Sequence, residues 1–140
     1  MSSYQPCRDL SESAGITYNN MHSYYAHYGV DWEQPKILEQ ISELDNWDIL
    51  SDGEVIGAFR LAFDSSTCYL RDLQVCQNFQ NQGIGAVALA EAIRLAKRQG
   101  ATKLKLKVFK ISPAYRLYIR SGFTCNNEDE RFYYMAHNIT

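Results

Sequence analysis

The chain lacks the residue patterns that bind zinc. Its four cysteines, at positions 7, 68, 76 and 125, form no C-x-x-C pair, and no two histidines lie at ligand spacing. Because a zinc site needs several such ligands close together, we predict no metal. The cysteines are expected to be reduced, partly buried thiols of a cytoplasmic protein.

The chain also lacks a charge excess and a long apolar run. Its net charge is −2, whereas nucleic-acid-binding domains carry a clear basic excess. No apolar run is long enough to span a bilayer, and the amino terminus has neither the basic nor the apolar region of a signal peptide. We therefore expect a cytoplasmic protein that binds neither nucleic acid nor a membrane.

Internal repeats, low-complexity segments and interdomain linkers are absent as well. The 140 residues match the size of one ordinary domain and are enough to bury a core. We therefore expect a single domain over residues 1–140.

Helical and strand patterns succeed one another along this domain. The first nine residues read as irregular or, at best, as a short weak strand. Helices are expected over residues 10–28, 35–44, 86–99 and 112–121. Strands are expected over residues 47–50, 54–63, 67–75, 103–108, 123–125 and 131–136. The Asp52-Gly53 pair between two apolar runs predicts a tight hairpin.

A glycine-rich loop precedes the third predicted helix. Gly83 and Gly85 lie between the strand over 67–75 and the helix over 86–99. Glycine permits tight turns and lets a ligand approach the backbone closely. The first amides of a helix have no internal partners and carry partial positive charge. Such a site binds phosphate.

Several interpretations of this loop compete. A Walker loop is excluded because no Lys-Ser or Lys-Thr follows Gly85. Residues 83–88 read G-I-G-A-V-A and match the dinucleotide pattern, but a polar linker separates them from their strand. Lys103 also stands where that pattern expects an acidic residue. Two other interpretations are glycines that merely end a loop and a Q/R-x-x-G-x-G/A motif, which Gln80, Gly83 and Gly85 satisfy.

A second motif favours the last of these interpretations. Residues 108–123 read V-F-K-I-S-P-A-Y-R-L-Y-I-R-S-G-F. They resemble V-x-K-x-N-P-A-x-x-L-Y-x-R-x-G-F, a carboxy-terminal pattern of the GNAT N-acetyltransferase superfamily, whose pyrophosphate loop has the Q/R-x-x-G-x-G/A motif. The resemblance covers most of residues 35–136. It implies an α/β (α+β) fold with a mixed, mostly antiparallel central sheet flanked by helices.

The same resemblance implies acetyl-CoA as the co-substrate. Main-chain groups of Leu73, Gln74 and Val75 would pair with the pantetheine arm as if it were another strand. The pyrophosphate would be held by the loop and the start of the helix, at Gln80, Asn81, Gln82, Gly83, Ile84, Gly85 and Ala86. Ser112 replaces the family's asparagine, which usually contacts the cofactor. The serine side chain is shorter and reaches less far toward the cofactor, although serine still suits the start of a helix.

The resemblance also gives Tyr118 the place of the general acid that protonates the thiolate of departing CoA. An amine attacks a thioester directly, so no nucleophilic residue is needed, but the amine must lose a proton. Asp72 is a candidate base, and the amide of Val75 is a candidate donor to the oxyanion. The competing interpretations are a core-edge aromatic for Tyr118 and a solvated strand charge for Asp72.

The sequence does not identify the acceptor, which the family resemblance limits to a small-molecule amine or a peptide. Together with Asp31 and Glu33, an aromatic acceptor wall would suit a small cationic amine. The residues expected in that wall are Tyr18, Tyr24, Tyr25, Tyr28 and Trp32. His22, His27 and Glu33 could also line the acceptor pocket, but the sequence favours ordinary surface positions or satisfied hydrogen-bond donors for them. Lysines 103, 105 and 107 read as a solvated strand face, and Lys110 is a candidate contact for cofactor phosphates. The sequence leaves open whether two copies of the chain form a homodimer.

A non-catalytic acyl-CoA-binding regulator is the alternative class of function. Such a protein would keep the glycine loop without needing Tyr118. Because Tyr118 is present within its motif, we favour the enzyme.

Overall fold

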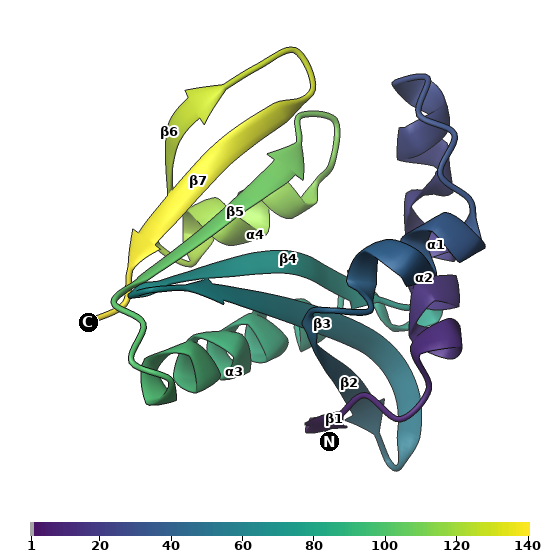
Figure 1. Cartoon of the computed structure of the whole chain (residues 1–140), viewed down its shortest axis with the longest axis horizontal. Coiled ribbons are helices and arrows are strands. Elements are labelled where there is room, and N and C mark those ends of the chain that lie inside the picture. Colours follow the sequence, from purple (N-terminus) through teal and green to yellow (C-terminus); the bar gives the residue numbers. More distant parts are fainter. Residues whose placement is uncertain (1) are drawn as a thin grey trace.

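The computed structural model describes residues 2–140, which form one seven-stranded sheet with helices on both faces (Figure 1). The strands are β1 (Ser2–Pro6), β2 (Asp45–Ser51), β3 (Glu54–Asp64), β4 (Thr67–Val75), β5 (Lys103–Phe109), β6 (Thr124–Glu128) and β7 (Phe132–Asn138). The helices are α1 (Leu10–His27), α2 (Gln34–Ile41), the short 3-10 helix η1 (Gln77–Phe79), α3 (Ile84–Arg98) and α4 (Ala114–Arg120).

The strand order is β1-β2-β3-β4-β5-β7-β6. Every neighbouring pair is antiparallel except β4 and β5, which run parallel. The parallel pair requires a crossover, and α3 supplies it. The expected mixed, mostly antiparallel sheet flanked by helices is therefore confirmed.

Two hydrophobic cores lie on opposite faces of the sheet. The larger core packs the alanine-rich side of α3, together with Tyr118 of α4, against the central strands. The smaller core packs α1 and α2 around Phe109, at the end of β5. In Figure 1, α1 accordingly stands at the open end of the sheet, beyond the tip of β5.

Two of the differences between the sequence-predicted elements and the structure have local causes. The weak amino-terminal strand is formed as β1, because β2 offers it an antiparallel partner from Ser2↔Ser51 to Pro6↔Trp47. The second helix ends at Ile41 rather than Leu44. There the side-chain amide of Asn46 donates to the carbonyl oxygens of Ile41 and Leu44, at 2.9 and 2.8 Å, and so terminates the helix.

The described part of the chain has a bulge in β4 that decides which way its side chains point. Arg60 of β3 pairs with Asp72, but the next residue, Leu61, pairs with Leu70, so Arg71 is an extra residue. Such a bulge bends a strand and re-aims its side chains. Leu70 joins the core under α3, whereas Asp72 meets Arg60 beneath α1.

Candidate active site

The strands β4 and β5 separate like the arms of a fork (Figure 1). They pair only at Thr67↔Lys103, Cys68↔Leu104 and Tyr69↔Lys105. Beyond Tyr69, β4 continues to Val75 with β3 on one side and no paired strand on the other. The bulge at Arg71 coincides with the point of separation. Backbone groups on this edge of β4 are thus open to a ligand.

The orientation of the carbonyl groups identifies which residues face the fork. The carbonyl oxygen of Val75 accepts hydrogen bonds from the side-chain amides of Asn20 and Gln80, at 2.9 and 2.8 Å, instead of from a strand. The carbonyl of Gln74 faces β3, where it lies so close to Gly57 that a Cβ there would clash. Because backbone direction alternates along a strand, the amides of Leu73 and Val75 face the fork.

Gln74 contributes in a different way from its two neighbours. Its backbone belongs to the β3 ladder, and its side chain is buried, with 8% exposed. The side-chain oxygen accepts from Asn20 of α1 at 3.2 Å. The amides of Leu73 and Val75 are thus on the open edge of β4, whereas Gln74 fixes α1 against β4.

The glycine loop ends in an uncapped helix terminus. Gly83 has a φ of 81°, a left-handed conformation that favours glycine, and it precedes Ile84, the first residue of α3. The helix thus begins two residues before the predicted Ala86. Because no side chain caps this end of the helix, its first amides are open to a ligand. The side chains of Gln80 and Gln82 brace the loop by donating to the carbonyls of Val75 and Asn78.

Gly85 is not required by the packing of the chain itself. A Cβ at this position would meet Leu117 of α4 at 3.5 Å, which is an ordinary contact. The bare backbone therefore leaves room beside the terminus of α3 for something outside the chain. The same contact places the beginning of α3 next to α4.

Ser112 stands just before α4 and is half-buried. Its hydroxyl accepts a hydrogen bond from the amide of Ala114, the first residue of α4, at 3.2 Å. The shorter side chain is thus occupied with the helix start. Lys110, two residues earlier, pairs with Glu128 at 3.1 Å.

Tyr118 lies in the larger core, with 6% of its surface exposed. Its ring packs edge-on against Phe123, with centroids 5.7 Å apart. Burial raises the pKa of its hydroxyl well above the ordinary value, and the negative charge of Asp72 raises it further. The hydroxyl therefore stays protonated at neutral pH, as a proton donor must.

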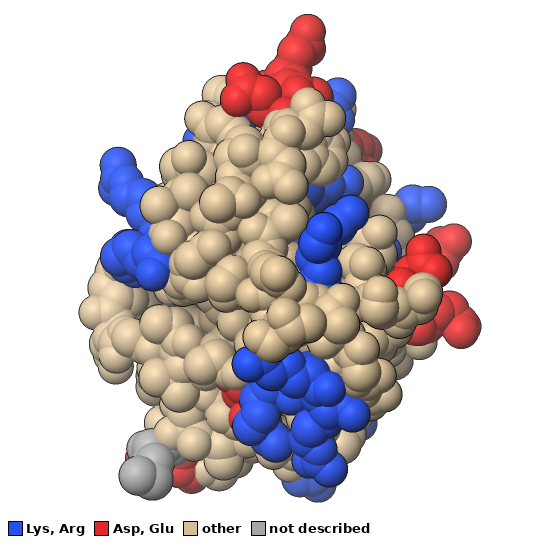
Figure 2. All heavy atoms as spheres, turned by 90° about the vertical axis from the view of Figure 1, so that its left-hand side faces the viewer, with Lys and Arg blue, Asp and Glu red and all other residues tan. Residues whose placement is uncertain are grey.

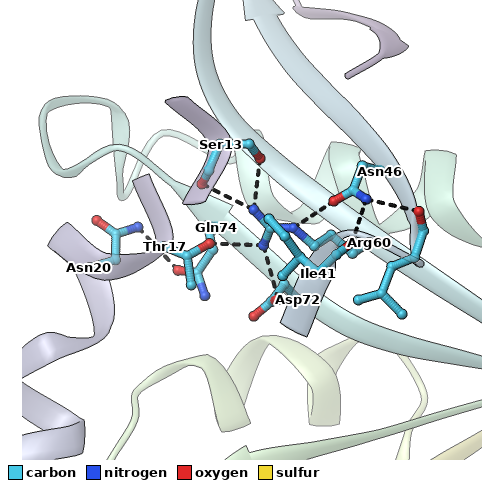
Figure 3. Close-up of polar contacts among 9 residues, drawn as sticks. Ser13, Thr17, Asn20, Ile41, Asn46, Arg60, Asp72 and Gln74 are labelled. Carbon is cyan, nitrogen blue, oxygen red and sulfur yellow. Dashed lines mark hydrogen bonds and ion pairs between the residues drawn. The ribbon is translucent and has the colours of Figure 1, made fainter. Parts of the chain in front are cut away.

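Asp72 is held by a buried arginine (Figure 3). Its carboxylate lies 2.9 Å from the guanidinium of Arg60, which is fully buried, while 21% of the Asp72 side chain remains exposed. The other four N–H groups of Arg60 donate to α1 and to the start of β2. Their acceptors are the side chain and carbonyl of Ser13, Thr17 and Asn46, at 2.7 to 3.0 Å. All five donors of the guanidinium are thereby satisfied.

Asp72 is also the electrostatic link between α1 and α4. Its charge raises the pKa values of both Tyr118 of α4 and the buried Tyr25 of α1, after burial itself as the larger cause. The charge of Asp72 thus acts on Tyr118, the other catalytic residue predicted from the sequence.

Two residues of this region, Arg60 and Asn20, are not among those predicted from the sequence. Arg60 is the one basic residue within an apolar strand, which was the available signal. Asn20 follows Ser13 and Thr17 at helical spacing, so the three form a small polar stripe on one side of α1. That stripe is the surface that α1 turns toward Arg60 and Gln74 (Figure 3).

The aromatic residues expected in an acceptor wall mostly pack around Phe109. Tyr24 and Tyr28 stack on its ring, at centroid distances of 5.9 and 5.1 Å, and Tyr25 meets it edge-on at 6.1 Å. Trp32 contacts Tyr25 at 5.2 Å. Tyr18 stacks on His22 and packs partly buried against the same core. The remaining candidates, His22, His27, Asp31 and Glu33, are exposed.

A cavity of about 550 Å³ lies at the base of the fork. It begins where β4 and β5 part and extends to the hairpin of β6 and β7. The lining residues are Tyr69, Leu70, Arg71, Lys105, Leu106, Lys107, Asn126, Asn127, Tyr134, Met135 and Ala136. Within residues 2–140, no group of three or more His, Cys, Asp and Glu side chains is placed to hold a metal ion.

An open strand edge beside an uncapped helix terminus suits a ligand with an extended polar arm and a phosphate group. The chain belongs to the acetyltransferase (GNAT) family, whose sequence model matches residues 15–123. No curated protein sequence matches the chain. None of the helices within residues 2–140 is long and apolar enough to cross a membrane.

Solved structures of similar fold cover nearly the whole chain. Paia N-acetyltransferase from Thermoplasma acidophilum, in complex with coenzyme A, has a TM-score of 0.82 at 19% identity, over 99% of both chains. The ribosomal-protein-S18-alanine N-acetyltransferase from Escherichia coli has a TM-score of 0.79 at 18% identity, over 100% of this chain and 95% of its own. A GNAT family acetyltransferase from Elizabethkingia anophelis with acetyl-CoA bound has a TM-score of 0.75 at 17% identity, over 98% and 97%.

Proposed function

We propose that the chain, as one catalytic domain over residues 1–140, transfers an acetyl group from acetyl-CoA to an amine. The observation that carries this proposal is the continuity of two features. The fork-facing amides of Leu73 and Val75 lead directly, through the glycine loop, to the uncapped start of α3. An extended arm along β4 would thus end with its pyrophosphate at residues 82–86. Two similar structures were crystallised with coenzyme A or acetyl-CoA, which supports this ligand.

The transfer proceeds in a ternary complex without a covalent enzyme intermediate. The amine nitrogen attacks the thioester carbonyl carbon, a C–N bond forms, and the C–S bond breaks with its electron pair on sulfur. Asp72 accepts the proton that the amine loses. An amide on the edge of β4, Leu73 or Val75, donates to the oxyanion. The hydroxyl of Tyr118 provides the proton for the departing thiolate.

The surroundings of Asp72 support its assignment as the base. One carboxylate oxygen is bound to Arg60, which fixes the group, while the exposed part of the side chain leaves room for an amine or a bridging water. The four free cysteines support the cytoplasmic location expected from the sequence, because free thiols are typical of reducing compartments.

Free thiol released from acetyl-CoA across a panel of amines tests the function. We expect at least one amine to accelerate release well above hydrolysis, with an equal amount of acetylated amine formed. If acetyl-CoA binds but no amine, amino acid or peptide accelerates release, the proposed enzyme activity is wrong. The alternative function, a non-catalytic acyl-CoA-binding regulator, is then favoured.

Gly85→Ala tests the placement of the pyrophosphate. The added methyl finds only an ordinary contact within the chain, and alanine is the better helix former, so the melting temperature should not fall. The methyl would keep a phosphate from the helix amides. Losing a hydrogen bond to a charged group raises KM for acetyl-CoA by about 10- to 100-fold.

A matched control for this substitution is Ala90→Val, which adds bulk at an exposed position further along α3. Its KM for acetyl-CoA should stay near that of the unaltered protein. An unchanged KM in the Gly85→Ala protein would place the pyrophosphate elsewhere.

A further inference from the structure

The cavity at the base of the fork is electropositive. Arg71 lines it from the β4 bulge, and Lys105 and Lys107 line it from β5. Among the described residues, no other charged one lines the cavity. The whole chain carries a net charge of −2, so this is a local concentration of positive charge in a slightly acidic protein. Low-dielectric walls strengthen the field inside such a hollow.

The three cations of the cavity have no carboxylate partner within residues 2–140. The ion pairs there join Arg60 to Asp72 and, at the surface, Arg94 to Glu91 and Lys110 to Glu128. The ammonium of Lys107 lies over the ring of Phe132, 4.5 Å from its centroid. Positive charges that line a hollow without internal neutralisation favour an anionic ligand.

A second basic patch on the same protein shows the contrast. Figure 2 shows lysine and arginine side chains gathered over the carboxy-terminal end of α3, where Arg94, Lys97 and Arg98 lie. These side chains project from a convex surface, and Arg94 is paired with Glu91. They complement the helix dipole, whereas the cations of the fork line a hollow that is open on one side.

The cavity lies at the opposite end of the open β4 edge from the phosphate loop. The loop follows Val75, whereas the cavity begins at Tyr69 and Arg71. A cofactor whose pyrophosphate sits at residues 82–86 would therefore direct its nucleotide away from the cavity. The reacting end would lie near Leu73, two residues beyond Arg71 and about 7 Å along the strand. The cavity is thus beside the acetyl group and away from the cofactor phosphates.

We propose that the acceptor is a small amine that also carries an anionic group, a carboxylate or a phosphate. This inference rests on the proposed acetyl transfer. Arg71, Lys105 and Lys107 hold the anionic group, and the amine then points along β4 toward Asp72. The cavity volume of about 550 Å³ is in the range of small-molecule sites. Such an acceptor carries a negative charge in addition to its amine, unlike the simple cationic amine that Asp31 and Glu33 suggested in the sequence.

The test compares amines that differ only in the anionic group. The matched pairs are β-alanine with propylamine and phosphoethanolamine with ethanolamine. Putrescine represents amines that carry a second positive charge. We expect kcat/KM for thiol release to be at least about tenfold higher for one member with the anionic group than for its partner without it, as for a hydrogen bond to a charged group. The pair that shows the preference distinguishes a carboxylate from a phosphate.

Lys105→Met identifies the site responsible for that preference. It should reduce the ratio of kcat/KM values within the preferred pair toward one and leave KM for acetyl-CoA unchanged. Lys103→Met is the matched control, because Lys103 is on the same strand but does not line the cavity. The control should retain the full preference and the same melting temperature.

Several results would overturn the inference while leaving the acetyltransferase intact. These are equal rates within each pair, fastest transfer to putrescine, or a Lys105→Met effect on acetyl-CoA alone. Absence of thiol release with every amine would instead contradict the proposed function. Calorimetric titration of β-alanine and phosphoethanolamine into the intact protein and the Lys105→Met variant would then decide the inference separately. Binding lost in the variant supports it, and no binding to either protein overturns it.

Discussion

Tyr118→Phe is expected to lower kcat by about 10²- to 10⁴-fold, the usual contribution of a general acid. The substitution removes only the hydroxyl and keeps the ring that packs against Phe123, so the core should stay intact. KM for acetyl-CoA should change little, because the proton is needed when the thiolate leaves rather than when the substrate binds. Steady-state kinetics with a working amine measure both values.

Tyr115→Phe is the matched control for this prediction. Tyr115 lies on the same helix, and its ring packs against Tyr133, with centroids 4.5 Å apart. Loss of that hydroxyl should leave kcat unchanged. If Tyr118→Phe also retains full turnover, Tyr118 is a core aromatic and another group protonates the thiolate.

The raised pKa of Tyr118 also sets an expectation for the pH profile of the same reaction. A group whose pKa is raised above its ordinary value remains protonated until higher pH. Loss of the acid should therefore not reduce kcat between pH 7 and about pH 10. A fall of kcat within that interval would have to come from a different group.

Arg60→Met is expected to destabilise the folded chain by about 3–5 kcal/mol, the usual effect of removing one partner of a buried ion pair. Methionine fits the volume but leaves the carboxylate of Asp72 without its cation. It also leaves the acceptors on Ser13, Thr17 and Asn46 without a donor. Because domains of this size have total stabilities of about 5–15 kcal/mol, the loss is a large share.

Urea unfolding followed by circular dichroism measures this change in the free energy of unfolding. Arg98→Met is the control, because Arg98 is exposed in the last turn of α3 and surface substitutions change stability by about 0.5 kcal/mol or less. A loss below about 1 kcal/mol for Arg60→Met would mean that water replaces the guanidinium and that the buried network contributes little.

The regular elements were predictable because their signals are local. The strand Thr67–Val75 agrees at both ends, since turn residues flank its apolar run. The hairpin at Asp52-Gly53 is formed for the same reason. Gly83 also follows from local geometry, because a tight left-handed turn before a helix favours glycine.

The features that make a site depend on contacts between distant segments. Arg71 becomes an extra residue only when β4 is set against β3, so nothing within residues 67–75 marks the bulge. The separation of β4 from β5 likewise depends on two strands whose paired residues lie about 36 positions apart. The role of Arg60 cannot be predicted from its own strand, because its partners on α1 are 43 to 47 positions away.

The lysine-rich strand shows how alternation alone can mislead about function. Alternating Leu and Lys predicts a strand with one wet face, and β5 is such a strand. Its polar face, however, partly lines the cavity that Arg71 and Tyr134 also line, so this face is not wholly exposed to solvent. Periodicity assigns a side chain to a face, but the neighbouring strands decide what that face meets.

The small number of pairs between β4 and β5 has a thermodynamic consequence. The sheet consists of two halves, β1–β4 and β5–β7, joined by three residue pairs and by the packing of the helices. A substrate in the fork would contact both halves and act as a cross-link that only the folded chain can bind. By mass action, the apparent stability then rises with the logarithm of substrate concentration above Kd. Abundant acetyl-CoA would thereby help to hold the two half-sheets together.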